Sequence, residues 1–108
     1  FDIYSNLLRD IAEFMPEIPN SRRNRWLTTL LLKEKNTHLK VIEALNKHNI
    51  ESRPLWKPMH LQPVFKGAKC IVDGTSEDYF SRGICLPSGA DMSDELVEKV
   101  ANIVRGAL

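Results

Sequence analysis

The residues best suited to chemistry lie in one proline-rich stretch, Glu51–Phe65, which combines cations, a tryptophan and a histidine. Arg53 and Lys57 could bind phosphate oxygens, because a guanidinium can bind two oxygens at once and an ammonium adds a point charge. Two solvated loop cations are an equal alternative on chemistry alone. Three prolines stiffen the backbone, and a stiff loop presents its side chains at low entropic cost. We therefore predict ligand contacts in this stretch.

Two further side chains of this stretch have alternative roles. Trp56 could stack on a planar base, but packing between the loop and the core is the favoured interpretation. His60 could hydrogen-bond a substrate or simply fix the loop, and the residue types do not separate these two roles. Both residues are kept as candidate substrate contacts beside Arg53 and Lys57.

Nothing in the chain has the arrangement of a catalytic or metal centre. Ser88 lacks the histidine and carboxylate spacing of a nucleophile and is predicted to be a turn residue. The lysines fall on a predicted helix face or in loops, where a solvated surface is the expected role. No metal-ligand spacing links the histidines and cysteines, which are His38, His48, His60, Cys70 and Cys85. We predict no catalytic residue, no cofactor-binding residue and no metal site.

Composition limits the possible classes of protein. The 108 residues fit one domain, and 43% hydrophobic residues suffice for a core. Fifteen basic and 14 acidic residues leave a net charge of +1, whereas a nucleic-acid binder usually shows a basic excess. No apolar run approaches the roughly 20 residues of a membrane span. Cys70 and Cys85 are too few for a disulfide framework, and Cys85 is predicted to be a buried thiol, so we expect a cytoplasmic, reducing location.

Helical spacing of apolar residues predicts several helices. One begins at residue 1, a second is capped by Asn36 or Thr37 and runs to about Lys47, and a short one starts at Thr75 or Ser76. The last is capped by Ser93 and carries Arg105 in its final turn. The predicted inward stripes are Ile3, Leu7, Leu8 and Ile11 in the first helix; Leu39, Ile42 and Leu45, flanked by Val41 and Ala44, in the second; and Leu96, Val97, Val100, Ala101 and Val104 in the last.

The remaining apolar runs predict short strands. Trp26–Leu32 is typical of a buried central strand, with Trp26 in the core. Ile84–Leu86 predicts a second strand, and residues 50–53 predict an extended segment before prolines that allow a strand only at an edge. Helices alternating with short strands indicate an α/β (α+β) fold: a small, mostly antiparallel sheet with helices packed on one face.

Three segments carry a resemblance to a known family. Arg53–Pro63 resembles the small-domain loop of the DegT/DnrJ/EryC1/StrS aminotransferases, which are pyridoxal-phosphate enzymes acting on nucleotide-linked keto sugars. Asn24–Thr28 is similar to the strand with which that family enters its small domain. Ile84–Gly89, followed by Met92 and Ser93, resembles the closing strand and final helix. The resemblance covers essentially the whole chain.

The resemblance implies more than the residues show by themselves. In this family a lysine and an aspartate of the large N-terminal domain hold the cofactor, and nothing in this chain matches those segments. Residues 1–108 would then be the C-terminal small domain of a fold-type I aminotransferase, with the pyridoxal phosphate domain absent from the chain. The helix that begins at residue 1 without a preceding capping segment leads to the same expectation.

The implied enzyme transfers an amino group, usually from glutamate, to a nucleotide-linked keto sugar for a bacterial glycan. Its active site lies at a homodimer interface, and Arg53, Trp56, Lys57 and His60 would help to close the substrate pocket. Arg25 is expected to pair with an acidic group of the missing domain. The isolated fragment is expected to be inactive and free of cofactor, with no nucleic-acid or membrane partner.

Two other classes of function compete with this interpretation. A free-standing small α/β domain that binds a ligand or a partner protein would have the same composition and elements. A small RNA-binding module is a weaker alternative, because the charge is balanced and no paired aromatics are predicted on exposed strands.

Overall fold

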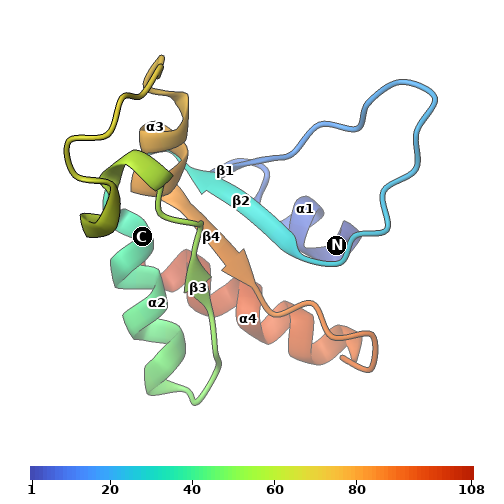
Figure 1. Ribbon diagram of the computed structural model, residues 1–108. Coiled ribbons are helices and arrows are strands. Elements are labelled where there is room, and N and C mark those ends of the chain that lie inside the picture. The colour runs from blue at the N-terminus through green and yellow to red at the C-terminus, as the bar shows by residue number, and fades with distance from the viewer.

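The computed structural model describes residues 1–108, in which helices and strands alternate as predicted (Figure 1). The elements are α1 (Asp2–Leu8), β1 (Ala12–Phe14), β2 (Thr28–Leu32), α2 (Thr37–Lys47), β3 (Arg53–Pro54), the 3-10 turns η1 (Met59–Leu61) and η2 (Pro63–Phe65), α3 (Thr75–Arg82), β4 (Gly83–Leu86) and α4 (Asp94–Gly106). No helix is long and apolar enough to pass through a lipid bilayer.

The strands form one antiparallel sheet in the order β1-β2-β4-β3. The prediction of a central strand is confirmed, because β2 pairs with β1 on one side and with β4 on the other. The prolines restrict β3 to the edge, as expected, where Arg53 lies opposite Cys85 of β4. Cys85 in turn lies opposite Thr29 of β2, so these three residues share one face of the sheet.

Helices cover only one face of this sheet. Figure 1 shows α1 and α4 behind the sheet and α2 beside the edge strand β3, while no α-helix crosses the near face. Residues of β2 alternate between buried and half-buried, as expected for a strand with one covered face. The core on the covered side consists of Tyr4, Leu8, Ala12, Leu30, Leu32, Val41, Leu45, Ile84, Leu86, Val100, Ala101 and Val104. The α/β (α+β) fold with helices on one face is therefore confirmed.

The predicted inward stripes are right in part. In α1 the buried residues are Tyr4 and Leu8, whereas Leu7 is exposed. In α2 the prediction of Leu39 is wrong: it is 56% exposed, and His38 occupies the covered side. Leu96 of α4 is also exposed. A helix buries the narrow stripe that its crossing angle brings to the sheet, and periodicity fixes the stripe only to within about one residue on either side.

Charged side chains fasten two helices in place. Arg105 of α4 donates to both carboxylate oxygens of Asp10, at 2.7 and 2.8 Å, and to the Leu7 carbonyl at 2.7 Å. The hydrogen bond from Arg105 lowers the pKa of Asp10 to about 2. Arg82 of α3 donates to Asp78 at 2.8 Å and to Glu13 of β1 at 3.0 Å, which holds α3 against the sheet.

The turn before β2 differs from its prediction. Arg25 adopts a left-handed backbone with φ 51°, and its guanidinium lies 4.4 Å from the Phe1 ring centroid. The same guanidinium donates to Asp2 at 2.7 Å and to Glu17 at 3.4 Å. Arg25 therefore pairs with carboxylates of this chain, whereas an acidic group of another domain was expected. Trp26 follows this turn and is 73% exposed, so its prediction as a core residue is wrong. The strand begins only at Thr28, and the turn directs the indole away from the covered face.

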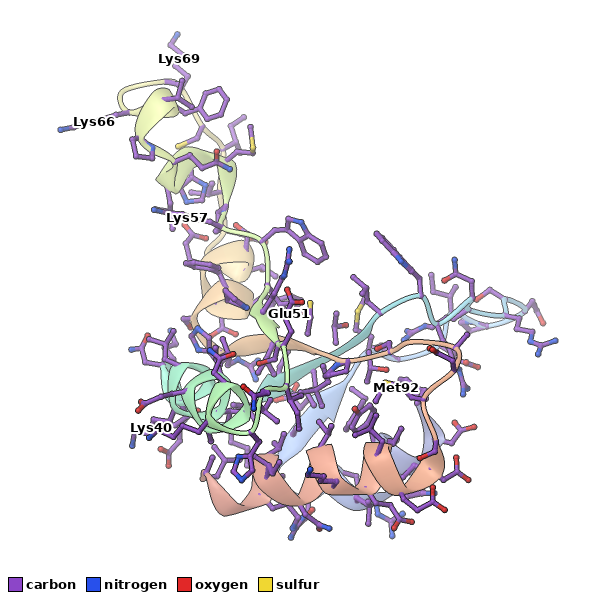
Figure 2. The ribbon with its side chains drawn as sticks, turned by 90° about the horizontal axis from the view of Figure 1, so that it is seen from below. Lys40, Glu51, Lys57, Lys66, Lys69 and Met92 are labelled. Atoms are coloured by element: carbon purple, nitrogen blue, oxygen red, sulfur yellow. The ribbon has the colours of Figure 1, made fainter.

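Between Lys57 and Gly74 the chain forms a projecting arm that contains η1 and η2. Figure 2 shows Lys66 and Lys69 at the far end of this arm and Lys57 nearer to its base. Most of its side chains are exposed, including Val64 and Ile71. The prolines exclude regular helix here, as predicted, and leave only single 3-10 turns.

Candidate functional site

The uncovered face of the sheet contains a groove of about 820 Å³, called here the tryptophan groove. It is lined by residues 26–27, 51–54, 56 and 85–89, which come from the turn before β2, from β3 and its flanks, and from the end of β4. Its volume lies within the range of about 300–1,000 Å³ that small-molecule sites occupy. The groove is therefore the candidate binding site.

Two of the four predicted site residues meet in this groove, namely Arg53 and Trp56. Arg53 belongs to β3 and lies on the uncovered face opposite Cys85. Its Nε donates to Glu51 Oε1 at 2.8 Å and its Nη2 donates to the same oxygen at 2.5 Å. Glu51 also lines the groove, so its carboxylate would compete with an anion for the Arg53 guanidinium.

Trp56 is 69% exposed, so it does not pack between the loop and the core as favoured from sequence. The neighbouring Leu55 supplies that packing instead: a Cβ built on Gly83 would lie 2.2 Å from Leu55 Cδ1. Leu55 N–H also donates to the Gly83 carbonyl at 3.3 Å. Because Leu55 faces the sheet, the next side chain, Trp56, points into the groove region.

A second groove of about 400 Å³, the apolar groove, lies beside the first. It is lined by residues 13–16, 29–31, 55–56, 76 and 79–80, most of them apolar, and Trp56 borders both grooves. Together the two grooves leave the uncovered face hollowed and partly apolar.

Lys57 and His60 line neither of these grooves. Lys57 is exposed and has no ion-pair partner. His60 Nε2 donates to Glu77 Oε1 of α3 at 2.7 Å, and both side chains are largely covered. The backbone N–H of Glu77, and next the hydrogen bonds from His60 and Ser76, lower the pKa of Glu77. This contact fits the loop-fixing role of His60, while a contact with substrate stays a prediction.

Ser88 and Cys85 have structural surroundings. The backbone N–H of Thr28 donates to Ser88 Oγ at 2.7 Å, and Ser88 Oγ donates to the Leu86 carbonyl at 2.9 Å. Ser88 thus fastens the end of β4 to the start of β2, in agreement with its predicted turn role. Cys85 is half-buried rather than buried, and burial raises the pKa of its thiol, which disfavours the reactive thiolate.

The residues of this chain do not fit the pyridoxal phosphate that the resemblance implies. An aldimine needs a lysine in a shielded site, but every lysine of the chain is exposed and none lines the tryptophan groove or the apolar groove. Groups of three or more histidine, cysteine or carboxylate side chains that could hold a metal are also absent. The chemistry available here is therefore binding: a guanidinium and two indoles line an open groove, and the free ammonium of Lys57 lies outside it.

Sequence reasoning missed Trp26 as a groove residue. Little in the sequence indicates that Trp26 is exposed, because the apolar run Trp26–Leu32 continues directly into a buried strand. Asn24 accepts from the Trp26 backbone N–H at 3.2 Å, and this local turn separates Trp26 from the strand.

Comparison with known proteins gives this chain a family. The chain is 41% identical over 110 residues to EpsN of Bacillus subtilis (strain 168), whose name describes a pyridoxal phosphate-dependent aminotransferase. It is 32% identical over 83 residues to the GDP-perosamine synthase of Vibrio cholerae. These matches span 96% and 74% of this chain but only 28% and 23% of the relatives, so the chain corresponds to about a quarter of their length.

A solved structure shows the same fold. A protein of Streptococcus pneumoniae described as a sugar aminotransferase, in its PMP form, superposes with a TM-score of 0.84 at 20% identity. The superposition covers 98% of this chain and 28% of that one. The model of the DegT/DnrJ/EryC1/StrS aminotransferase family matches residues 1–105, and the chain belongs to that family.

Proposed function

We propose that this chain is the C-terminal small domain of a pyridoxal-phosphate-dependent aminotransferase that acts on a nucleotide-linked keto sugar. The observation that carries the proposal is the tryptophan groove, which places Arg53 and an exposed indole on the uncovered sheet face of a chain from this family. The cofactor and its lysine belong to the rest of the protein, since the residues here do not fit them.

The names of two relatives support the substrate class. GDP-perosamine synthase names a nucleotide-linked amino sugar, and one structural neighbour was solved with a TDP-sugar product. Both named compounds carry a diphosphate between a nucleoside and a sugar. For this protein we propose a nucleotide-linked sugar that is a precursor of a bacterial glycan.

Arg53 is the proposed diphosphate ligand, with Lys57 as a second cation at the base of the arm. A guanidinium can bind two phosphate oxygens at once, which suits a diphosphate. Binding requires Arg53 to turn at least partly from Glu51, and this costs little because both side chains are about three-quarters exposed. His60 holds the arm to α3 and so sets the position of Lys57.

Glutamate as amino donor, a homodimer with the active site at its interface and a cytoplasmic location complete the proposal. They follow from the family resemblance. Within this chain the free face of the sheet is the surface on which the remaining protein would close over the substrate.

The full-length protein carrying Arg53→Gln tests the proposal. We expect KM for the nucleotide sugar to rise about tenfold, since hydrogen bonds to charged groups contribute about 1.5–3 kcal/mol, while KM for glutamate stays unchanged. Arg22→Gln, on an exposed loop outside the groove, is the matched control. Equal KM values for Arg53→Gln and wild type would refute the assigned role.

The isolated chain provides a second test. We expect no transaminase activity and no aldimine absorbance after incubation with pyridoxal phosphate. Stoichiometric aldimine on residues 1–108 would show that the covalent chemistry resides here after all. Specific binding of an unrelated partner, without any transamination by the full-length protein, would favour a free-standing binding domain.

A further inference from the structure

Both tryptophans of the chain line the tryptophan groove. Trp26 and Trp56 are 30 positions apart, and they are the only two tryptophans in the sequence. They line the same groove and are 73% and 69% exposed. Large aromatic side chains usually bury most of their surface, so two exposed indoles at one groove mark a surface that another molecule or the rest of the protein can contact.

The backbone that carries each indole is fixed by other residues. On one side, Arg25 is held by Phe1, Asp2 and Glu17, and Asn24 accepts from the Trp26 N–H. Trp26 is therefore positioned without using its ring. Neither indole takes part in an aromatic pair, since the one such pair in the chain is Phe1–Phe14.

On the other side, Leu55 packs on Gly83 and Pro58 is buried, so the residues flanking Trp56 anchor the loop. The indole of Trp56 takes no part in anchoring this loop. Fixed backbones with unengaged rings are what a binding site needs, because little entropy is lost when a ligand binds.

The groove that both indoles line is also partly polar. Arg53 lies on its wall, and the volume of about 820 Å³ exceeds that of a single planar ring system. A ligand with a flat base at one end and negative charge a few bonds away matches these groups. A nucleoside diphosphate has this chemistry, because every base offers a π-face to an indole.

We propose that Trp26 and Trp56 are the base-binding walls of the nucleotide site, and that they stack on the nucleobase while Arg53 binds the diphosphate. The inference rests on the proposed function and adds Trp26 as a residue that determines affinity for the nucleoside part. Stacking on a ring face tolerates different bases, so the two indoles favour a nucleotide over a plain sugar phosphate without choosing among bases.

Binding to the full-length protein tests the inference. The probes are UDP, GDP, TDP and inorganic pyrophosphate, measured by calorimetry for wild type, Trp26→Leu and Trp56→Leu. Loss of one stacking partner should weaken nucleotide binding roughly 5- to 100-fold and leave pyrophosphate affinity within about twofold. Trp26→Phe should recover most of the loss. Phe65→Leu, on the arm outside both grooves, is the matched aromatic control.

Several outcomes would overturn the inference. One is unchanged nucleotide affinity in both tryptophan variants. Another is an equal loss for pyrophosphate together with a lower melting temperature, which would show that the indoles pack against the rest of the protein. A third is a wild type that binds none of the three nucleotides.

Measuring amination of a nucleotide-linked sugar distinguishes a failure of this inference from a failure of the proposed function. If wild type aminates a nucleotide-linked sugar while both tryptophan variants keep wild-type KM, only the base-binding walls are refuted. If wild type aminates no such sugar, the proposed function itself fails.

Discussion

The two faces of the sheet differ in what they contain. On the covered face, Leu30, Leu32 and Ile84 are fully buried beneath the helices. On the uncovered face, Thr29 and Cys85 are half-buried, and two grooves that share Trp56 hollow the surface. One four-stranded sheet thus carries a dry core on one side and an open, partly polar surface on the other.

This difference separates stability from binding. The covered face obtains its free energy from apolar burial, which needs no particular chemistry beyond shape and size. The uncovered face positions an arginine, a glutamate and two indoles on a rigid sheet without burying them. Substitutions should therefore change stability on one face and ligand affinity on the other.

The largest contrast is expected from one substitution made on both faces of β2. Leu30→Ala should lower the free energy of unfolding by about 3 kcal/mol, because it leaves a cavity in the core. Leu31→Ala, on the half-buried side, should cost about 1 kcal/mol. Urea denaturation of the two variants measures both values. Equal costs would mean that the uncovered face is a second core.

A smaller effect is expected at the junction of the two faces. A Cβ on Gly83 would lie 2.5 Å from the Tyr79 carbonyl oxygen, which the helix backbone cannot readily move. Gly83→Ala should cost about 1–3 kcal/mol and displace Leu55, and with it Trp56.

Gly106→Ala is the matched control for that substitution. No atom lies within 4 Å of a Cβ built there, and the residue ends α4, so the change should be neutral or stabilising by up to about 1 kcal/mol. A Gly83→Ala variant as stable as Gly106→Ala would contradict the tight contact with Leu55.

On the covered face, lowering the pH should reduce the stability of the fold through His38. The side chain is 4% exposed, its Nδ1 has no hydrogen-bond partner, and burial lowers its pKa from 6.5. The folded state therefore binds this proton less readily than the unfolded state. Its stability contribution is complete above about pH 6.5 and declines as the pH falls through the lowered pKa.

Thermal unfolding between pH 7.5 and 5 measures this decline. His38→Gln should flatten the dependence on pH, whereas His48→Gln, at an exposed position on the end of α2, should leave it as in wild type. A slope that survives His38→Gln would assign the effect to another group.

The smallest expected effect lies on the uncovered face. Glu51→Gln removes the carboxylate that holds Arg53, and an exposed ion pair contributes about 0.2–1 kcal/mol. Nucleotide-sugar affinity of the full-length protein should rise by up to about fivefold. Glu43→Gln, which breaks an exposed pair with Lys47 on α2, is the control. Weaker binding in Glu51→Gln would mean that the carboxylate positions Arg53 rather than competing for it.

Much of the fold could be predicted because its signals are local. The helix α2 ends at Lys47 as expected, and α4 begins after Ser93, whose Oγ accepts from the Leu96 N–H at 3.3 Å. Capping and periodicity act within a few residues, so they can be found in a single segment. The same holds for the prolines that restrict β3 to an edge.

The site was predictable only in part. Arg53 and Trp56 were recognised because a proline-stiffened loop concentrates unusual side chains. The partner of Arg25, the exposure of Trp26 and the buried His38 could not be found, because each depends on which surface a distant element covers.

The sequence by itself determined most of the elements, the small one-sided sheet, and the loop that carries the candidate ligand contacts. Only the tertiary structure decided that the face opposite the helices stays open, and that Trp26 joins Trp56 and Arg53 in one groove. The physical reason is the separation along the chain of the residues that determine each feature. Caps, turns and stripes arise from neighbours along the chain, whereas a groove arises where β3, β4 and the turn before β2 meet across the sheet.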